Sequence, residues 1–165
     1  MDKTNLLFVI TKLELGGAQT QLLSLIRNLD ASQYNIFLFT AASGLLMSDA
    51  RGIPGVSVHP SPHLERAINP LSDIPAFFEL VRFIKKNRIG IVHTHSSKAG
   101  IIGRFAAAAA GVRKIFHTVH GWPFHPHQSP VAYMLYVLLE RIAAHATTRI
   151  IVVCEADKRR GLAAG

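Results

Sequence analysis

The chain has 165 residues, of which 49% are hydrophobic and only 17% are charged. This length and composition fit one compact domain with a full core and exclude a disordered tail protein. Lys and Arg outnumber Asp and Glu by 18 to 10, and the resulting charge of +8 suits an anionic partner such as a nucleotide diphosphate or a phospholipid surface. The basic residues lack the aromatic-interleaved stripe typical of nucleic-acid binders, so we expect no nucleic-acid partner.

The cysteine content and the hydrophobic runs bear on location. The only cysteine, Cys154, excludes an intrachain disulfide and fits a reducing compartment. The N-terminal apolar run, Leu6–Ile10, is too short for a signal peptide, and the longest run, Val131–Leu139, is far shorter than a membrane span. We therefore expect a cytoplasmic protein that at most binds the inner face of the cell membrane.

Short runs rich in apolar and β-branched residues alternate along the chain with helical patterns. The predicted strands are Leu6–Thr11, Tyr34–Thr40, Val56–His59, Ile89–His93, Lys114–Val119 and Arg149–Val153. The predicted helices are Ala18–Leu29, Leu45–Arg51, one that Ser72 or Asp73 caps and Lys85–Arg88 closes, Lys98–Ala110, Val131–Ala144, and one beginning near Ala156. This alternation predicts a doubly wound, Rossmann-like α/β fold with a parallel sheet of about six strands.

Three polar clusters follow predicted strands. They are Glu14–Gln19, His93–Lys98 and His120–His125. Ligands of open α/β sheets bind outside the carboxyl ends of the strands. If the first, fourth and fifth strands lie side by side in the middle of the sheet, the three clusters meet at one cleft.

Gly16 and Gly17 stand where the first strand turns into a helix. The backbone N–H groups and dipole of a helix N-terminus favour a phosphate, although a turn that needs a positive φ would explain the same glycines. The pair is not part of a G-x-G-x-x-G motif, and the second strand ends without an acidic residue. No G-K-[ST] follows either, so both an NAD site and a P-loop are excluded.

Two histidines, His93 and His95, alternate with Thr94 and point to the same side of an extended segment. Such a pair could bind a metal, but carboxylate ligands are scarce at this edge, and we expect no metal site. His93 is interpreted as a hydrogen-bonded core histidine. His95, Ser96 and Lys98 form a polar cluster suited to holding a ligand, although Ser96 could be only a helix N-cap.

The third cluster contains His120 and the only tryptophan, Trp122. The imidazole of His120 could donate a hydrogen bond to a sugar hydroxyl or a phosphate, or act as a base. Trp122 and Phe124 could form a platform for a sugar or lipid, or a hydrophobic plug. Glu140, further on, is interpreted as one half of a surface ion pair with Arg141.

Four segments of the chain, taken together and in order, resemble the family 4 glycosyltransferases, in particular those that build bacterial capsule, exopolysaccharide or O-antigen units. They are residues 6–19, 92–103, 116–124 and 140–160. The resemblance implies a GT-B fold, in which two Rossmann-like domains face each other across a cleft. Residues 1–165 would be the N-terminal, acceptor-side domain, and the C-terminal, donor-binding domain would be absent from this chain.

The same resemblance implies roles for residues. Gly16 and Gly17 match the glycine pair near the donor phosphates, and His120 matches the histidine near the transferred sugar. The donor would be a nucleotide-sugar, UDP-linked in our expectation, and the full-length protein a retaining hexosyltransferase that needs no metal or other cofactor. We assign His95, Ser96, Lys98 and Trp122 to the acceptor, which would be a glycan or a lipid-linked sugar.

Further expectations concern the fragment itself and its surroundings. We expect residues 1–165 alone to fold but to be catalytically inactive. The loops Pro60–Pro70, with Leu64 and Arg66, and Trp122–Pro130 could face an anionic membrane surface. Two alternatives stay open: half of a nucleotide-sugar epimerase of the same fold, which would need acid/base carboxylates at the cleft, and a Rossmann-like binding domain without catalysis.

Overall fold

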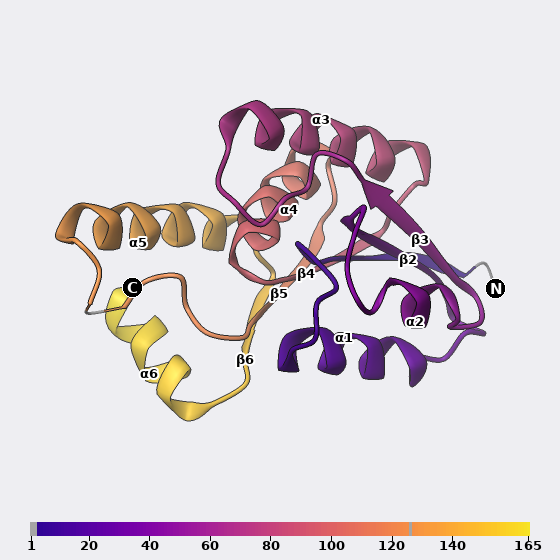
Figure 1. The fold of residues 1–165 in the computed structure, drawn as a ribbon, viewed down its shortest axis with the longest axis horizontal. Coiled ribbons are helices and arrows are strands. Elements are labelled where there is room, and N and C mark those ends of the chain that lie inside the picture. Colours follow the sequence, from indigo (N-terminus) through magenta and orange to yellow (C-terminus); the bar gives the residue numbers. More distant parts are fainter. Residues whose placement is uncertain (1–2, 126) are drawn as a thin grey trace.

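The computed structural model describes residues 3–125 and 127–165 and contains one six-stranded parallel sheet (Figure 1). The strands are β1 (Thr4–Val9), β2 (Tyr34–Ala41), β3 (Val56–Ser61), β4 (Ile91–His95), β5 (Lys114–Val119) and β6 (Arg149–Val152). The helices are α1 (Gly17–Arg27), α2 (Met47–Arg51), α3 (Pro70–Lys86), α4 (Ser97–Ala109), α5 (Pro130–His145) and α6 (Glu155–Ala164). None of these helices is long and apolar enough to cross a membrane.

The strand order is β3-β2-β1-β4-β5-β6, with every neighbouring pair parallel. Right-handed crossovers from a central β1 put α3, α4 and α5 over one face of the sheet and α1 and α2 over the other (Figure 1). The predicted doubly wound fold is therefore confirmed. The first, fourth and fifth strands lie side by side, as the cleft hypothesis requires.

The core consists of two layers, because alternate residues of β1 point to opposite faces of the sheet. Leu6, Phe8 and Ile10 pack toward α1. Leu7 and Val9 pack in the layer beneath α3 and α4. Both sets are buried, so the chain from Leu6 to Ile10 is apolar on both faces of the sheet.

Helix α4 approaches the sheet closely, as its run of alanines predicts. Gly100 and Gly103 face β4 and β5, where a Cβ on Gly100 would lie 2.5 Å from the ring of His117 and one on Gly103 would lie 2.7 Å from Thr94 Cγ2. Ala99, like the buried alanines further along, completes this flat side of the helix. Small residues are therefore required here by packing rather than by helix propensity.

The structure corrects several predicted boundaries: β1 is Thr4–Val9 rather than Leu6–Thr11, and two further corrections bear on the site. Helix α3 begins at Pro70, and its cap is Asn69, whose side chain accepts a hydrogen bond from Leu71 N, rather than Ser72 or Asp73. The fourth strand is Ile91–His95 rather than Ile89–His93, because the N–H of Ile89 still bonds to Ile84 O at the end of α3. His95, and not His93, therefore stands at the carboxyl end of the strand.

The close packing of α4 gives a direct test. Gly100→Ala should destabilise the chain by about 1–3 kcal/mol, because the added methyl group forces the helix away from His117. Gly17→Ala is the matched control, since a Cβ at that position meets nothing within 4 Å, and it should change stability by less than about 0.5 kcal/mol. Urea denaturation of both variants measures the difference. Equal free energies of unfolding for the two variants would show that α4 can move away from the sheet without cost.

Candidate active site at the carboxyl edge of the sheet

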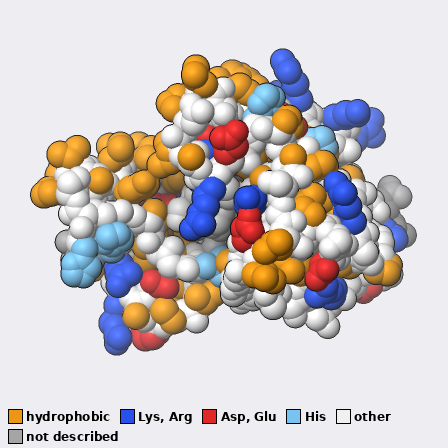
Figure 2. Space-filling model, in the orientation of Figure 1, with side chains coloured by type: hydrophobic (Ala, Val, Ile, Leu, Met, Phe, Trp, Pro, Cys, Tyr) orange, Lys and Arg blue, Asp and Glu red, His pale blue; other side chains and the backbone are white. Residues whose placement is uncertain are grey.

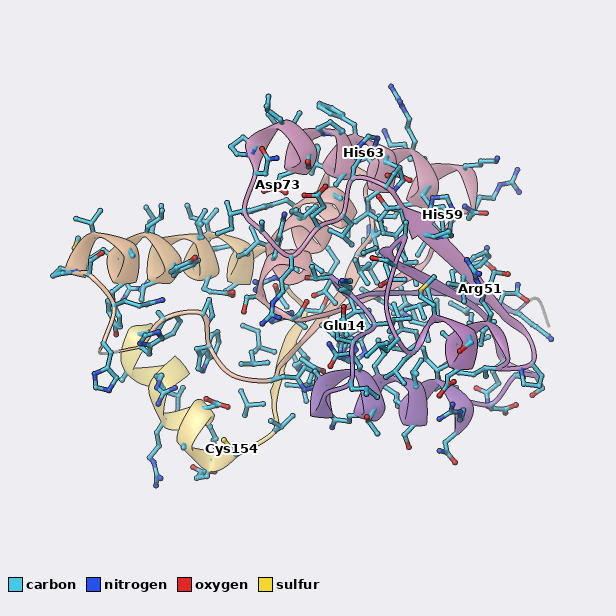
Figure 3. The ribbon with its side chains drawn as sticks, in the orientation of Figure 1. Glu14, Arg51, His59, His63, Asp73 and Cys154 are labelled. Atoms are coloured by element: carbon cyan, nitrogen blue, oxygen red, sulfur yellow. The ribbon has the colours of Figure 1, made fainter. Side chains whose placement is uncertain are left out.

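A cavity of about 660 Å³ lies at the carboxyl edge of the sheet. Its walls come from the loop after β1, the loop before α3, the start of α4 and the inner side of α5. Among the predicted site residues, Gly16, Ser96 and Lys98 line it. Glu14, from the loop after β1, and Asp73, from the first turn of α3, line the same cavity, and both are labelled in Figure 3.

The glycine pair opens space at the start of α1. Gly16 has an extended backbone with φ −174°, so the alternative of a turn that needs a positive φ is wrong. No side chain caps this helix, and a Cβ at Gly17 would meet no atom within 4 Å. The backbone N–H groups of the first turn therefore have no side-chain cap, which leaves them free to bind an oxyanion, and the Gln19 side chain folds back beside Gly16, with its Oε1 2.7 Å from where a Cβ would stand.

Ser96 links β1 to α4. Its φ of 63° and ψ of 154° lie in a region that residues other than glycine rarely adopt, at a cost of about 1–3 kcal/mol. It stands at the N-cap position of α4, but its hydroxyl does not cap the helix. Instead, Ser96 Oγ lies 2.7 Å from Thr11 Oγ1 and accepts a hydrogen bond from Thr11 N. The alternative that Ser96 is only an N-cap is therefore wrong.

The lysines of the cavity are paired with carboxylates. Lys98 forms an ion pair with Asp73 and donates a hydrogen bond to Ala67 O, so it ties the loop before α3 to α4. Lys12 lies 2.6 Å from Glu14. The cavity is therefore lined by charges that largely neutralise each other, and its uncompensated positive character comes from helix N-termini and Arg66.

Four histidines of β4, β5 and the residue after β5 each make a side-chain hydrogen bond. His95 Nδ1 lies 3.0 Å from His120 Nε2, and their rings are stacked. His93 Nε2 lies 2.8 Å from Thr118 Oγ1, which confirms the hydrogen-bonded histidine, although the ring is only partly buried. His117 bonds to Thr94 in the same way. His95 is buried and His120 half-buried, and neither belongs to the cavity lining.

Burial keeps these imidazoles neutral near pH 7. Desolvation, helped by the neighbouring His120, lowers the pKa of His93 to about 4. Desolvation and the nearby Arg104 lower the pKa of His117 to about 3. Burial also lowers the pKa of His95, well below its ordinary value, and that of His120. A neutral His120 has one ring nitrogen that donates and one that accepts, so it can hydrogen-bond to a hydroxyl or a phosphate.

The residues of the third predicted cluster, His120–His125, do not lie together: His120 contacts His95, whereas Trp122 and Phe124 pack toward α6. Trp122 Nε1 donates to Asp157 O, and the indole packs on Gly161 and stacks on Phe124. Phe124 is buried and Trp122 is half-buried, which favours the hydrophobic plug over the platform for a sugar or lipid. Trp122 lines a second cavity, toward α6, and its assignment to the acceptor stays a prediction.

Glu140 is not a surface residue. It is buried between α4 and α5, and its Oε2 accepts a hydrogen bond of 2.5 Å from Nη2 of Arg104, which is fully buried. Arg104 Nε also donates to Gly100 O. The interpretation of Glu140 as a surface partner of Arg141 is therefore wrong. A glutamate on an otherwise apolar helix, with an arginine inside the preceding alanine-rich helix, was the signal that could have indicated the pair.

Among residues 3–125 and 127–165, no three His, Cys, Asp or Glu side chains are grouped so that they could hold a metal ion.

The fold resembles those of solved glycosyltransferases of the GT-B type. A glycosyltransferase from Rickettsia africae superposes with a TM-score of 0.72 at 16% identity, over 98% of this chain and 40% of that one. MurG from Acinetobacter baumannii gives a TM-score of 0.64 at 10% identity, over 90% of this chain and 41% of that one. At these identities the likeness shows the fold alone, and the fold is the one that the sequence predicts.

Sequence comparison then gives the family. Residues 15–165 match the model for Glycosyltransferase Family 4, so the chain belongs to that family. An Escherichia coli UDP-Gal:alpha-D-GlcNAc-diphosphoundecaprenol alpha-1,3-galactosyltransferase is 37% identical over 87% of this chain. The O-antigen biosynthesis glycosyltransferase WbnH of Escherichia coli is 28% identical over 96% of it. The chain spans only 37% and 44% of the lengths of these two relatives.

The buried ion pair allows a test of stability. Glu140→Ala should destabilise the chain by about 3–5 kcal/mol, because it leaves the buried Arg104 guanidinium without its counter-charge. Glu155→Ala, which breaks an exposed pair with Lys158, is the matched control and should cost less than about 1 kcal/mol. The double variant Arg104→Met/Glu140→Leu should recover most of the loss. Chemical denaturation measures the free energy of unfolding of each variant. If Glu140→Ala is as stable as Glu155→Ala, the assignment of a buried ion pair between Arg104 and Glu140 is wrong.

The buried histidines predict a loss of stability in acid. In the unfolded chain each titrates near pH 6.5, whereas His93 and His117 in the folded chain stay neutral down to about pH 4 and 3. The unfolded state therefore binds more protons below pH 6.5, and stability, complete above that pH, falls as the pH drops toward the folded pKa values. Between pH 7 and 5 each such histidine should cost roughly 2 kcal/mol.

Urea denaturation at both pH values measures this loss in the wild type and in His117→Gln, whose amide can still bond to Thr94. The variant should lose less stability between pH 7 and 5 than the wild type does. Identical losses would mean that His117 takes up its proton in the folded state as readily as in the unfolded one.

Proposed function

We propose that the complete protein transfers a hexose from a UDP-linked sugar to a lipid-linked sugar in cell-surface polysaccharide synthesis, in the cytoplasm at the inner face of the membrane. Membership of glycosyltransferase family 4 supports the reaction class. The printed name of the Escherichia coli relative, which pairs UDP-Gal with a GlcNAc-diphosphoundecaprenol, supports the kinds of donor and acceptor. O-antigen synthesis is the printed role of the second relative.

The observation that carries the proposal is the uncapped N-terminus of α1 beside the edge cavity. With open space at Gly17 and no side-chain cap on the helix, a diphosphate would reach the backbone N–H groups beside the Gln19 side chain. The positive end of the helix then lies where negative charge grows as the nucleoside diphosphate leaves. This is the donor side of the reaction in our proposal.

The chemistry needs little else from this chain. A bond forms between the acceptor hydroxyl oxygen and the anomeric carbon, and the bond from that carbon to the phosphate oxygen breaks. The nucleoside diphosphate takes the electron pair, and the hydroxyl proton passes to a phosphate oxygen. Because His120 is neutral, it would donate a hydrogen bond to the transferred sugar or a phosphate without carrying charge of its own. We propose retention of the anomeric configuration.

The remaining predicted residues act on the acceptor side in this scheme. Ser96 and Lys98 line the cavity and would contact the acceptor directly. His95 is buried against His120, so we propose that it positions that ring rather than touching a ligand. Trp122 would act only by holding its loop, since its indole N–H is already bonded to Asp157 O.

We further propose that residues 1–165 alone do not turn over substrate. The base and ribose of the donor have no evident partner at this edge, and a few backbone hydrogen bonds, each worth about 1 kcal/mol net, bind a nucleotide-sugar only weakly. Calorimetry of this chain with UDP-galactose should therefore detect little binding. Tight binding would contradict the assignment of the chain to the acceptor side.

Two substitutions in the complete enzyme test the site. Gly17→Ala should raise the KM for the UDP-sugar about tenfold or more, because its methyl group fills the space against which the phosphates pack. His120→Ala should lower kcat about 100-fold or more, because it removes a hydrogen bond made to a group that changes in the transition state. Radiolabelled transfer to a synthetic lipid-diphosphate-linked GlcNAc measures both.

The control is Gln21→Ala, on the exposed side of α1, which should leave both constants within about twofold. Full activity of His120→Ala would contradict the assignment of His120 to the active site. An unchanged KM for the UDP-sugar in Gly17→Ala would contradict the placement of the diphosphate at the start of α1.

A further inference from the structure

Thr11, the second residue after β1, is buried and lines the edge cavity, and the proposed function gives it no task. Its hydroxyl oxygen lies 2.7 Å from Ser96 Oγ and accepts a hydrogen bond from Ala99 N. Its backbone N–H donates to Ser96 Oγ as well. One threonine therefore joins the end of β1 both to the strained residue before α4 and to the first turn of that helix.

Thr11 also takes over a bond that a helix usually makes with its own N-cap residue. That residue is Ser96 here, and its side chain accepts no hydrogen bond from α4. Ala99 N–H donates instead to Thr11 Oγ1, 88 residues earlier in the chain. The φ of 63° and ψ of 154° at Ser96 accompany a hydroxyl that lies against Thr11 rather than over the helix. A backbone conformation this rare outside glycine points to a functional constraint.

The hydrogen atoms of the two hydroxyl groups can be assigned by counting. Each hydroxyl has one hydrogen to donate and two lone pairs that accept. One of the two hydrogens lies between the oxygens, and the other finds no acceptor in the described part of the chain. An unpaired hydrogen costs more where it is buried, so it belongs to the half-buried Ser96 rather than to Thr11, which is 7% exposed. Thr11 is then the donor between the two oxygens.

This assignment gives a chain of donors that all run in one direction. Ala99 N–H donates to Thr11 Oγ1, Thr11 O–H donates to Ser96 Oγ, and the Ser96 hydrogen is left for a ligand in the cavity. Hydrogen bonds in series polarise one another, which makes Ser96 a stronger donor than an isolated serine. Both lone pairs of Ser96 Oγ are taken, one by Thr11 O–H and one by Thr11 N–H. Ser96 can therefore donate to a ligand but cannot accept from one.

The lysines of the cavity do not replace this donor, because they are paired with carboxylates. Lys12 lies 2.6 Å from Glu14, and Lys98 pairs with Asp73. Figure 2 shows basic and acidic side chains next to each other in the middle of this face of the molecule. A neutral donor whose own lone pairs are filled therefore has a large part in what the cavity selects. It selects an oxygen that accepts a hydrogen bond.

We propose that Thr11 is a positioning residue for the acceptor: it orients Ser96 so that the serine hydroxyl donates to an oxygen of the lipid-linked sugar. The inference rests on the proposed function, in which Ser96 contacts the acceptor, and adds the residue that acts through it and the direction of the bond. The strained backbone of Ser96 follows from this arrangement, since the hydroxyl has to stand between Thr11 and the ligand.

Substitutions of Thr11 in the complete enzyme test the proposal, with radiolabelled transfer from UDP-galactose to a synthetic lipid-diphosphate-linked GlcNAc. Thr11→Val keeps the shape of the side chain and removes the hydroxyl. It should raise the KM for the acceptor about five- to tenfold, the equivalent of one hydrogen bond, and leave the KM for UDP-galactose within about twofold. Thr11→Ser keeps the hydroxyl and should restore the acceptor KM. A loss of packing alone would lower the amount of active enzyme without separating the two KM values.

Substitutions of Ser96 separate the hydroxyl from the backbone strain. Ser96→Gly and Ser96→Ala should both raise the acceptor KM as Thr11→Val does, because both remove the donor. Ser96→Gly should nevertheless unfold at a higher urea concentration than Ser96→Ala, since glycine adopts a φ of 63° without strain. These two variants also decide the matter if Thr11→Val does not fold. The matched control is Thr4→Val, at the exposed start of β1, which should leave both KM values within about twofold.

An unchanged acceptor KM in Thr11→Val, a rise in the KM for UDP-galactose instead, or no rescue by Thr11→Ser would overturn the proposal. Failure of the proposed function has a different signature, because the complete enzyme would then transfer no sugar to this acceptor. In that case calorimetry with the same acceptor and no donor tests Thr11. Thr11→Val should weaken binding about five- to tenfold, and equal Kd values, or no binding by the wild type, would overturn the inference too.

Discussion

The buried ion pair between Arg104 and Glu140 fixes how the second half of the molecule is arranged. Taking two charges out of water costs several kcal/mol for each ion, and the cost is offset only when the geometry is held by both elements. Arg104 is held by Gly100 O within α4, and α4 is held against β4 and β5 by its small residues. The pair therefore sets the rotation of α5 about its own axis.

That rotation has two consequences. It turns Tyr136 and Glu140 inward, where they complete a wall of the edge cavity. It also leaves Leu135 and Leu138 exposed, while Leu139 lines the cavity, although burying an exposed leucine would lower the free energy of an isolated domain by about 1.5–3 kcal/mol. The ion pair thus maintains both the cavity and the exposed leucines.

Much of the architecture could be predicted from the sequence, because the short apolar, β-branched runs of the strands and the alanine run of α4 are local signals. The sequence also predicted that Gly16, Ser96 and Lys98 would lie at the carboxyl edge of the sheet. They follow β1 and β4, which the topology makes neighbours. The start of the fourth strand was placed two residues too early because Ile89 is apolar yet still bonded to the end of α3. A hydrophobic pattern does not distinguish a buried helix end from a strand start.

The errors at the site have one physical cause: side chains that find partners far away in the sequence. Glu140 looks like a surface acid until Arg104, 36 residues earlier, is brought beneath it. Trp122 looks free until Asp157, 35 residues later, accepts its N–H. Lys98 likewise pairs with Asp73 from the preceding helix. Spacing along a chain reveals what stands at a sheet edge but not which of those groups are already bonded.

The distribution of bonded and free groups then determines what the edge can bind. The lysines lie beside carboxylates, and the histidines are kept neutral by burial, so neither provides strong net charge to the cavity. The N-cap residues of α1 and α4 provide no side-chain cap, and both helix starts border the same cavity. Fixed backbone dipoles need no reorganisation when charge develops on a ligand, whereas a lysine must first leave its carboxylate. An edge built in this way favours an anion whose charge grows during a reaction over one that is merely held.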